Sequence, residues 1–251
     1  MKWLARAVAL LGLVVMISAM GDFPEWGDPL SPASTGVGGF YLRNVMDQTG
    51  VPNIVTAVLA DYRGFDTMLE TAVVFAAGLA IMMIMRVPRS LRTVPKGSHR
   101  VMAHKDEDLI IRTACRLMVP AMQLFALYVL FHGHHSPGGG FQSGVILGAS
   151  VILFAISYDM RQVLRALTEN NQLRIVHVGF LIYAGTGLLA LLSGANFLDY
   201  AGLDWLLPGD ARDARYHSML IVEIGVTFTV MVTMFSMYAD LATDGRLEEG
   251  L

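Results

Sequence analysis

Features that mark many soluble enzymes are scarce in, or missing from, this sequence of 251 residues. The single cysteine, Cys115, excludes an internal disulfide and any cysteine-rich metal or cluster site. Charged residues make up only 16% of the chain, and the formal net charge of -3 gives no indication of a nucleic-acid partner. The chain has no Gly-rich phosphate loop, no HExxH helix and no recognisable nucleophile elbow. We therefore expect no enzymatic activity, no cofactor, no metal and no nucleic-acid partner.

Apolar residues, in contrast, are abundant, at 54% of the chain with a mean hydropathy of +0.52. This is too apolar for an ordinary soluble domain of such a length. A helix needs roughly 20 apolar residues to cross a bilayer. The sequence predicts an all-α polytopic membrane protein with six transmembrane helices, at 7–20, 67–85, 109–131, 139–158, 173–192 and 216–239. The first run also has the basic start and small residues of a signal peptide, but a transmembrane helix is the preferred interpretation.

The positions of Lys and Arg predict how these spans are oriented. Cytoplasmic segments of membrane proteins are enriched in both residues. With both termini in the cytoplasm, all 18 Lys and Arg residues except Arg43, Arg63, Arg212 and Arg215 fall in cytoplasmic segments or in the cytoplasmic ends of spans. The basic segment 89–108 is then a cytoplasmic linker between a two-span segment, 1–88, and a four-span domain, 109–251.

Three ionisable residues fall inside or near the predicted spans, namely Glu70, His177 and Glu223. Such residues are costly in hydrocarbon and are functional candidates for that reason. Because 173–192 and 216–239 are consecutive spans, we expect His177 and Glu223 to be in contact and able to pass a proton. The alternative is structural: Glu223 hydrogen-bonds to a neighbouring span, and His177 to a backbone carbonyl. Glu70 either shares a helix face with Arg63 and Asp66 as part of an ion path or only anchors its helix by pairing with Arg63.

A glycine-rich stretch at 133–142, Gly-His-His-Ser-Pro-Gly-Gly-Gly-Phe-Gln, separates the third and fourth spans. Without Cβ atoms, its backbone can approach another chain segment or an ion closely. Gly140, Gly144 and Gly148 recur every fourth residue, which predicts a smooth helix face for packing against another span. A metal site using His132, His134 and His135 is disfavoured, because no second span supplies ligands at a matching spacing.

Two segments of the chain resemble known families. The stretch Gly133-His134-His135-Ser136-Pro137-Gly138-Gly139-Gly140-Phe141 resembles the hallmark of the MnhB/MrpB-type subunit of Mrp/Mnh-type multisubunit cation/proton antiporters, and Glu223-Ile224-Gly225-Val226 resembles a weaker element of that family's last span. The segment 58–70, which contains Asp61-Tyr62-Arg63-Gly64-Phe65-Asp66 and Glu70, is similar to the C-terminal end of the large A-type subunit of these antiporters. It is also similar to a small separate subunit, of the MbhE type, in membrane-bound hydrogenases. The chain therefore looks like a fusion of two neighbouring components.

The resemblance implies a multi-pass subunit of the cell inner membrane that assembles with other subunits and contributes to a path for Na⁺ and H⁺. It implies that Asp61, Arg63, Asp66 and Glu70 lie by the ion path and that His134, Pro137 and Phe141 are functionally sensitive. The alternatives are a scaffold for other subunits, or a place in the membrane arm of a membrane-bound hydrogenase or another oxidoreductase related to respiratory complex I. The ion-path candidates, taken together, are Asp61, Arg63, Asp66, Glu70, His134, His177 and Glu223, and the structural motif comprises Pro137, Gly138, Gly139, Gly140, Phe141, Gly144 and Gly148.

Overall fold

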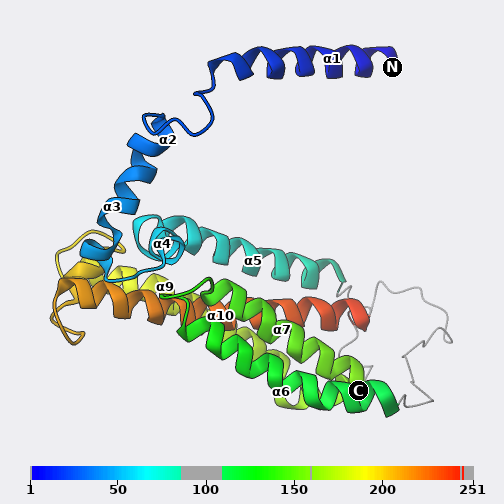
Figure 1. Ribbon diagram of the computed structural model, residues 1–251. Helices are drawn as coiled ribbons and strands as arrows, with labels where there is room; N and C mark the ends of the chain where they lie inside the picture. Colours follow the sequence, from blue (N-terminus) through cyan, green and yellow to red (C-terminus); the bar gives the residue numbers. More distant parts are fainter. Residues whose placement is uncertain (1, 86–108, 159, 244, 246–251) are drawn as a thin grey trace. The chain divides into compact units, whose positions relative to one another are not determined.

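The computed structural model describes residues 2–85, 109–158, 160–243 and 245 (Figure 1). All regular structure in these ranges is helical, and six helices in them are long and apolar enough to cross a membrane. These are α1 with the short η1 (Lys2–Asp22), α5 (Gly64–Met85), α6 (Leu109–Phe131), α7 (Gly140–Ser157), α9 (Glu169–Leu192) and α10 (Ala211–Ala242). The prediction of an all-α polytopic protein with six spans is confirmed. The predicted linker, 89–108, lies outside the described residues.

The chain divides into two units, Met1–Asn44 and Val45–Leu251. The first contains α1, the short α2 (Pro32–Thr35) and most of α3 (Val37–Thr49), and α1 buries none of its own side chains. The second contains α4 (Ile54–Ala57), the π-helical turn η2 (Val58–Tyr62), the five remaining spans, α8 (Met160–Ala166) and η4 (Tyr200–Leu203). All the candidate site residues belong to this second unit.

Two spans begin earlier in the chain than predicted, because each is capped by a residue before its apolar run. Asp210 accepts hydrogen bonds from the backbone N–H groups of Arg212 and Asp213, at 2.9 and 3.0 Å, and Asp213 completes a capping box. Helix α10 therefore begins at Ala211, not at 216. Thr168 caps α9 in the same way, so that helix begins at Glu169, not at 173. Charged residues in these first turns lower the local hydropathy, which is why the apolar pattern placed both starts too late.

Helix α10 is the central helix of the second unit and packs against α5, α7 and α9 (Figure 1). In lipid, helices gain little from burying apolar surface against one another, so close van der Waals packing of small residues holds them together. The stripe predicted on α7 makes such a contact: a Cβ on Gly144 would lie only 2.7 Å from the Thr227 carbonyl oxygen, and one on Gly148 only 3.2 Å from that of Met231. The predicted packing face is therefore confirmed, with α10 as its partner.

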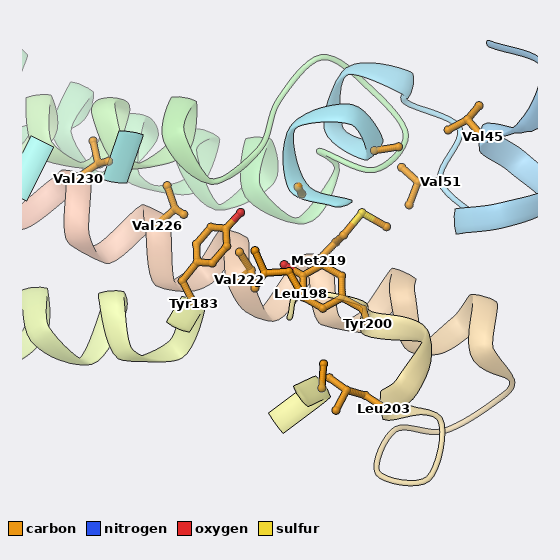
Figure 2. Packing of buried hydrophobic residues seen from close by; sticks show 13 residues of the cluster. Val45, Val51, Tyr183, Leu198, Tyr200, Leu203, Met219, Val222, Val226 and Val230 are labelled. Carbon is orange, nitrogen blue, oxygen red and sulfur yellow. The ribbon is translucent and has the colours of Figure 1, made fainter. Parts of the chain in front are cut away.

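Glycines on the other two neighbours of α10 allow the same close approach. A Cβ on Gly179 of α9 would lie 2.5 Å from the carbonyl oxygen of Gly225, and one on Gly78 of α5 would lie 2.6 Å from Cγ2 of Thr233. Beyond these crossings, larger side chains fill the space around the first half of α10. Figure 2 shows part of this cluster, in which Tyr183 of α9 packs with Val222 and Val226 of α10. Three helices are thus fixed against the helix that carries Glu223.

Candidate functional site

The most unusual polar contact in the protein joins His134, in the loop between α6 and α7, to Glu223 of α10. Nε2 of His134 lies 3.6 Å from Oε2 of Glu223. Both side chains are buried, and no group in the described parts of the chain forms a hydrogen bond with either of these two atoms. A buried polar atom without a partner costs free energy. The two atoms therefore face one another just beyond hydrogen-bonding distance, where a small movement or one water would connect them.

The glycine motif explains how the loop comes this close to α10. Gly139 has a φ of 126°, a conformation that L-residues with a side chain rarely adopt. A Cβ there would lie 2.7 Å from Oε1 of Glu223. The backbone N–H of Gly140 donates a hydrogen bond to the same carboxyl group. Gly139 and Gly140 thus form a backbone cradle for the carboxyl group, while Pro137 and Phe141 of the same motif are exposed.

His134 is held as a neutral imidazole. Burial, the largest cause, and charge repulsion from the neighbouring His135 and His217 together lower its pKa to about 4. The ring of Tyr216 packs edge-on against it, with the ring centroids 4.3 Å apart. At pH 7 the His134–Glu223 contact is therefore no salt bridge to a charged imidazolium.

A polar clamp from the segment before η2 holds the backbone of the histidine loop. The Asn53 side-chain amide donates to the carbonyl oxygens of Gly133 and Ser136, both at 2.8 Å. The Asn53 backbone N–H donates to the carbonyl oxygen of His134 at 2.9 Å. Thr56 donates a further hydrogen bond to the Gly133 carbonyl, at 2.7 Å. These bonds satisfy loop carbonyls that would otherwise lack partners away from water. Sequence reasoning missed this clamp, because an Asn after a Pro has the pattern of an ordinary turn residue.

A second polar cluster lies at the start of α10. Arg215 donates to both carboxylate oxygens of Asp61 at 2.8 Å and to Oδ1 of Asp199 at 2.9 Å. Burial raises the pKa of Asp61, and the Arg215 guanidinium opposes this rise. Arg215 was assigned to a loop by hydropathy alone. The capping signature formed by Asp210 and Asp213 could have placed it on the helix.

The remaining candidates lie apart from both clusters. Arg63 and Asp66 form an ion pair of 2.5 Å between exposed side chains, and Glu70 is exposed on α5. Arg63 therefore pairs with Asp66 and not, as the alternative predicted, with Glu70. His177 is exposed too; its Nδ1 lies 2.5 Å from the Leu173 carbonyl oxygen and its ring packs against Phe75.

The expected contact between His177 and Glu223 is wrong. The face of α9 that packs on α10 is the one with Gly179, whereas His177 lies on an exposed side. Glu223 instead meets a histidine from the glycine-rich loop. Across residues 2–85, 109–158, 160–243 and 245, no three His, Cys, Asp or Glu side chains converge as a metal site.

Fold and site together define a multi-pass membrane protein with an acid and a histidine buried between its helices. Comparison with known proteins identifies the family. Residues 110–236, half of the chain, match the family described as a domain related to the MnhB subunit of Na⁺/H⁺ antiporter, and the chain belongs to that family. Residues 29–99 match MbhE, a family of MBH subunits. Both resemblances are thereby confirmed, since 133–142 and Glu223 lie in the first match and 58–70 in the second.

Individual relatives agree with the family. The antiporter subunits mnhB2 of Staphylococcus aureus strains Newman and USA300 are 28% identical over 138 residues, which cover 55% of this chain and 96% of each relative. A chain in the structure of the Mrp complex from Dietzia sp. DQ12-45-1b matches with a TM-score of 0.70 and 28% identity, covering 98% of this protein. This protein spans only 26% of that chain.

A chain of the archaeal membrane-bound sulfane sulfur reductase has a similar fold. Its TM-score is 0.63 at 24% identity, and the match covers 92% of this protein and 97% of that chain. The protein therefore shares its fold with a chain of the Mrp complex and with a chain of a respiratory membrane complex.

Proposed function

We propose that the protein is a membrane subunit of a multisubunit antiporter that exchanges a monovalent cation, Na⁺, for protons across the cytoplasmic membrane. It works together with other subunits and contributes both to the ion path and to assembly. Its relatives in Staphylococcus aureus are named as antiporter subunits, and we assign it transport without catalysis. The domain boundaries at 88 and 108 stay predictions from the sequence.

The observation that carries this proposal is the buried pair of His134 and Glu223. A purely structural role would leave both groups hydrogen-bonded, because unpaired polar atoms are costly away from water. Here a neutral imidazole and a carboxyl group face each other at 3.6 Å with the facing atoms unsatisfied by any described residue. Such a pair can accept and release a proton with little movement. Asp61, Arg63, Asp66, Glu70 and His177 remain candidates for other points of the path.

Glu223→Gln in the assembled complex tests the proposal. The amide keeps the size of the side chain but cannot carry a proton, so we expect the rate of sodium-dependent pH recovery in everted membrane vesicles to fall at least about tenfold, with the complex still assembled. The matched control is Asp204→Asn, which neutralises an exposed acid outside the spans and should leave the rate unchanged. A normal rate for E223Q in an intact complex would favour the scaffold role instead.

A second candidate function follows from the match of residues 29–99 to the MbhE family. In this second candidate, the protein is a subunit of the membrane arm of a membrane-bound hydrogenase or a related oxidoreductase. The half of the chain that carries His134 and Glu223 matches the antiporter-related family, so the antiporter is the better supported host. Purification of the native complex distinguishes them, because a redox host would bring subunits with iron–sulfur clusters.

A further inference from the structure

Two buried hydroxyl groups join the first turn of α7 to α10, one helical turn from Glu223. Oγ of Ser143 on α7 lies 2.7 Å from Oγ1 of Thr227 on α10. The two residues are only 0% and 1% exposed. Thr227 follows Glu223 by four residues and therefore lies on the same face of α10. The hydroxyl pair thus lies beside the cradle that Gly139 and Gly140 form for the Glu223 carboxyl group.

Gly140 contacts α10 through both of its backbone polar groups. Its N–H donates to the Glu223 carboxyl group, and its carbonyl oxygen accepts a hydrogen bond from Thr227 Oγ1 at 3.0 Å. The Ser143 hydroxyl group also donates to this carbonyl oxygen, at 3.1 Å, but Ser143 belongs to α7 itself. A Cβ at Gly140 would overlap the Glu223 carbonyl oxygen, so only glycine allows this approach. The bond from Thr227 is therefore the one that ties the Gly140 carbonyl to α10.

Helix α7 takes its N-terminal cap from another helix. The first N–H groups of a helix have no carbonyl partner within it, and the side chain of the N-cap residue usually satisfies one of them. The N-cap residue of α7 is Gly139, which has no side chain for this purpose. The Glu223 carboxyl group replaces it by accepting from the Gly140 N–H. This bond and the partial positive charge of a helix N-terminus both stabilise the ionised form of a carboxyl group.

We propose that Thr227 is a positioning residue for proton transfer at Glu223. Its hydroxyl group fixes the Gly140 carbonyl and so keeps the Gly140 N–H directed at the carboxyl group. Ser143 supports Thr227 through the second hydroxyl contact between the two helices. The positioning role deepens the proposed function and rests on it, because positioning matters only if Glu223 accepts and releases a proton.

The oxygen atoms around Thr227 explain why both hydroxyl groups are needed. Its Oγ1 lies within 3.0 Å of three oxygens, namely the carbonyl oxygens of Gly140 and Glu223 and Oγ of Ser143. A hydroxyl group has one proton to donate and can also accept. Thr227 alone could therefore turn its proton to the Glu223 carbonyl of its own helix, as Thr229 does within α10 at 2.9 Å. Ser143 supplies a second proton to the same oxygens, so the contact with α7 is kept in either orientation.

A purely structural role is the alternative, since hydrogen bonds between spans also hold membrane helices together. Such a role would lower stability and assembly without changing how Glu223 responds to pH. Positioning predicts a changed response, because the Gly140 N–H stabilises the ionised form of the carboxyl group. Two further ionisable side chains act on Glu223, His134 of the loop and Tyr183 of α9, and both are retained in every variant below.

Thr227→Val in the assembled complex tests the proposal. Valine has nearly the shape of threonine but no hydroxyl group. We expect the rate of sodium-dependent pH recovery in everted membrane vesicles to fall about three- to tenfold, which corresponds to one hydrogen bond. The acid limb of the pH–rate profile should also move to higher pH by about half a unit or more, because the ionised form of Glu223 loses part of its stabilisation. An acid limb at the wild-type pH would overturn the proposal, whatever the rate.

Three further variants separate positioning from a general loosening of the helices. Thr229→Val makes the same change at another buried position of α10, where the hydroxyl group donates within the helix, and should leave the acid limb in place. Thr227→Ser keeps the hydroxyl group and should restore the wild-type limb. Ser143→Ala leaves the bond from Thr227 to Gly140 and should move the limb less than T227V does. A shift in T229V or T227S as large as that in T227V would contradict the proposal.

Glu223→Gln keeps the two proposals apart. Loss of activity in E223Q with an unshifted acid limb in T227V would retain the proposed function and refute only the positioning role. Normal activity in an assembled E223Q complex would refute the proposed function, and with it a positioning role in proton transfer. If T227V does not assemble, Thr227→Cys carries the test, because a thiol is a weaker donor of similar size. The acid limb should again move to higher pH, and an unshifted limb would overturn the proposal.

Discussion

His134 is neutral in the folded chain because burial lowers its pKa to about 4, whereas an imidazole in an unfolded chain has a pKa near 6.5. Between these values the unfolded chain binds a proton that the folded chain does not. The free energy of unfolding is therefore greatest above about pH 6.5 and decreases as the pH falls toward 4. His134 thus makes the stability of the fold sensitive to acid.

His134→Gln should remove this pH dependence. We expect the wild-type chain in detergent to lose up to about 3 kcal/mol between pH 7 and pH 4 through this group, and H134Q to lose correspondingly less. Thermal unfolding recorded across that range measures the difference. His132→Gln is the control, since His132 is exposed and stacks on Tyr128. Equal slopes for H134Q and wild type would mean that His134 is not buried as a neutral group.

Asp61 and Arg215 should be strongly coupled in stability. The Asp61 side chain is 3% exposed and that of Arg215 25%, so removing either partner leaves a mostly desolvated charge. We expect Arg215→Gln alone to cost about 1–3 kcal/mol, and the double variant D61N/R215Q to recover part of that loss. Arg63→Gln, which breaks the exposed pair with Asp66, should change stability by less than about 0.5 kcal/mol. Thermal unfolding of the four variants in detergent tests this, and additive effects of D61N and R215Q would contradict it.

Helix α7 depends on its glycine face at the level of whole elements. A Cβ added at Gly144 would lie 2.7 Å from the Thr227 carbonyl oxygen and 2.9 Å from Cβ of Val230, both parts of α10 that cannot easily move. Gly144→Ala should therefore destabilise the chain by about 1–3 kcal/mol. At Gly185 of α9 nothing lies within 4 Å of the added atom, so Gly185→Ala should be neutral or gain up to about 1 kcal/mol from helix propensity. Paired Tm measurements decide the matter, and similar losses for both would show that the stripe is not a packing face.

Sequence reasoning succeeded where a single helix carries the information. The apolar runs located all six spans, and the spacing of Gly140, Gly144 and Gly148 predicted a packing face without naming its partner. The same reasoning identified Glu223 as a buried acid from its depth in the last apolar run. Each of these features repeats with the period of a helix or extends over its length.

Sequence reasoning failed for contacts between residues of two different elements. Glu223 meets His134 because the backbone at Gly139 turns the loop toward α10, and no periodicity encodes that approach. Asn53 gave no signal, since its partners are carbonyl oxygens about 80 residues away along the chain. The early start of α10 was the exception: a local capping signature at Asp210 was present and outweighed by hydropathy.

At the scale of the whole molecule, the two family-matched parts meet through polar groups as well as through helix packing. Asn53 and Thr56 bond to the histidine loop, Asp61 pairs with Arg215, and the Tyr183 hydroxyl donates to the Gly64 carbonyl at 2.6 Å. Helix α5 also packs on α10. Each of these contacts joins residues 29–99 to residues 110–236.

These contacts predict that the chain can be divided. If it is cut inside the predicted linker, 89–108, and the two pieces are expressed together, we expect them to purify as a one-to-one pair. Association of the pieces would place the boundary between two domains in this segment. Failure of the pieces to associate, with each present in the membrane, would mean that the linker itself holds the two parts together.

The divided chain also exposes the contribution of Asn53. In the intact chain a linker of this length keeps the two parts at an effective concentration of about millimolar, so loss of the clamp has little effect on their association. In the divided chain that advantage is gone, and Asn53→Ala, which removes two side-chain hydrogen bonds to the histidine loop, should weaken association about tenfold or more. Co-purification at falling expression levels measures this. Asn44→Ala is the control, because the Asn44 side chain donates to the Phe40 carbonyl oxygen of its own helix at 2.8 Å. If N53A and N44A associate equally well, the clamp orders the His134 loop but does not hold the two parts together.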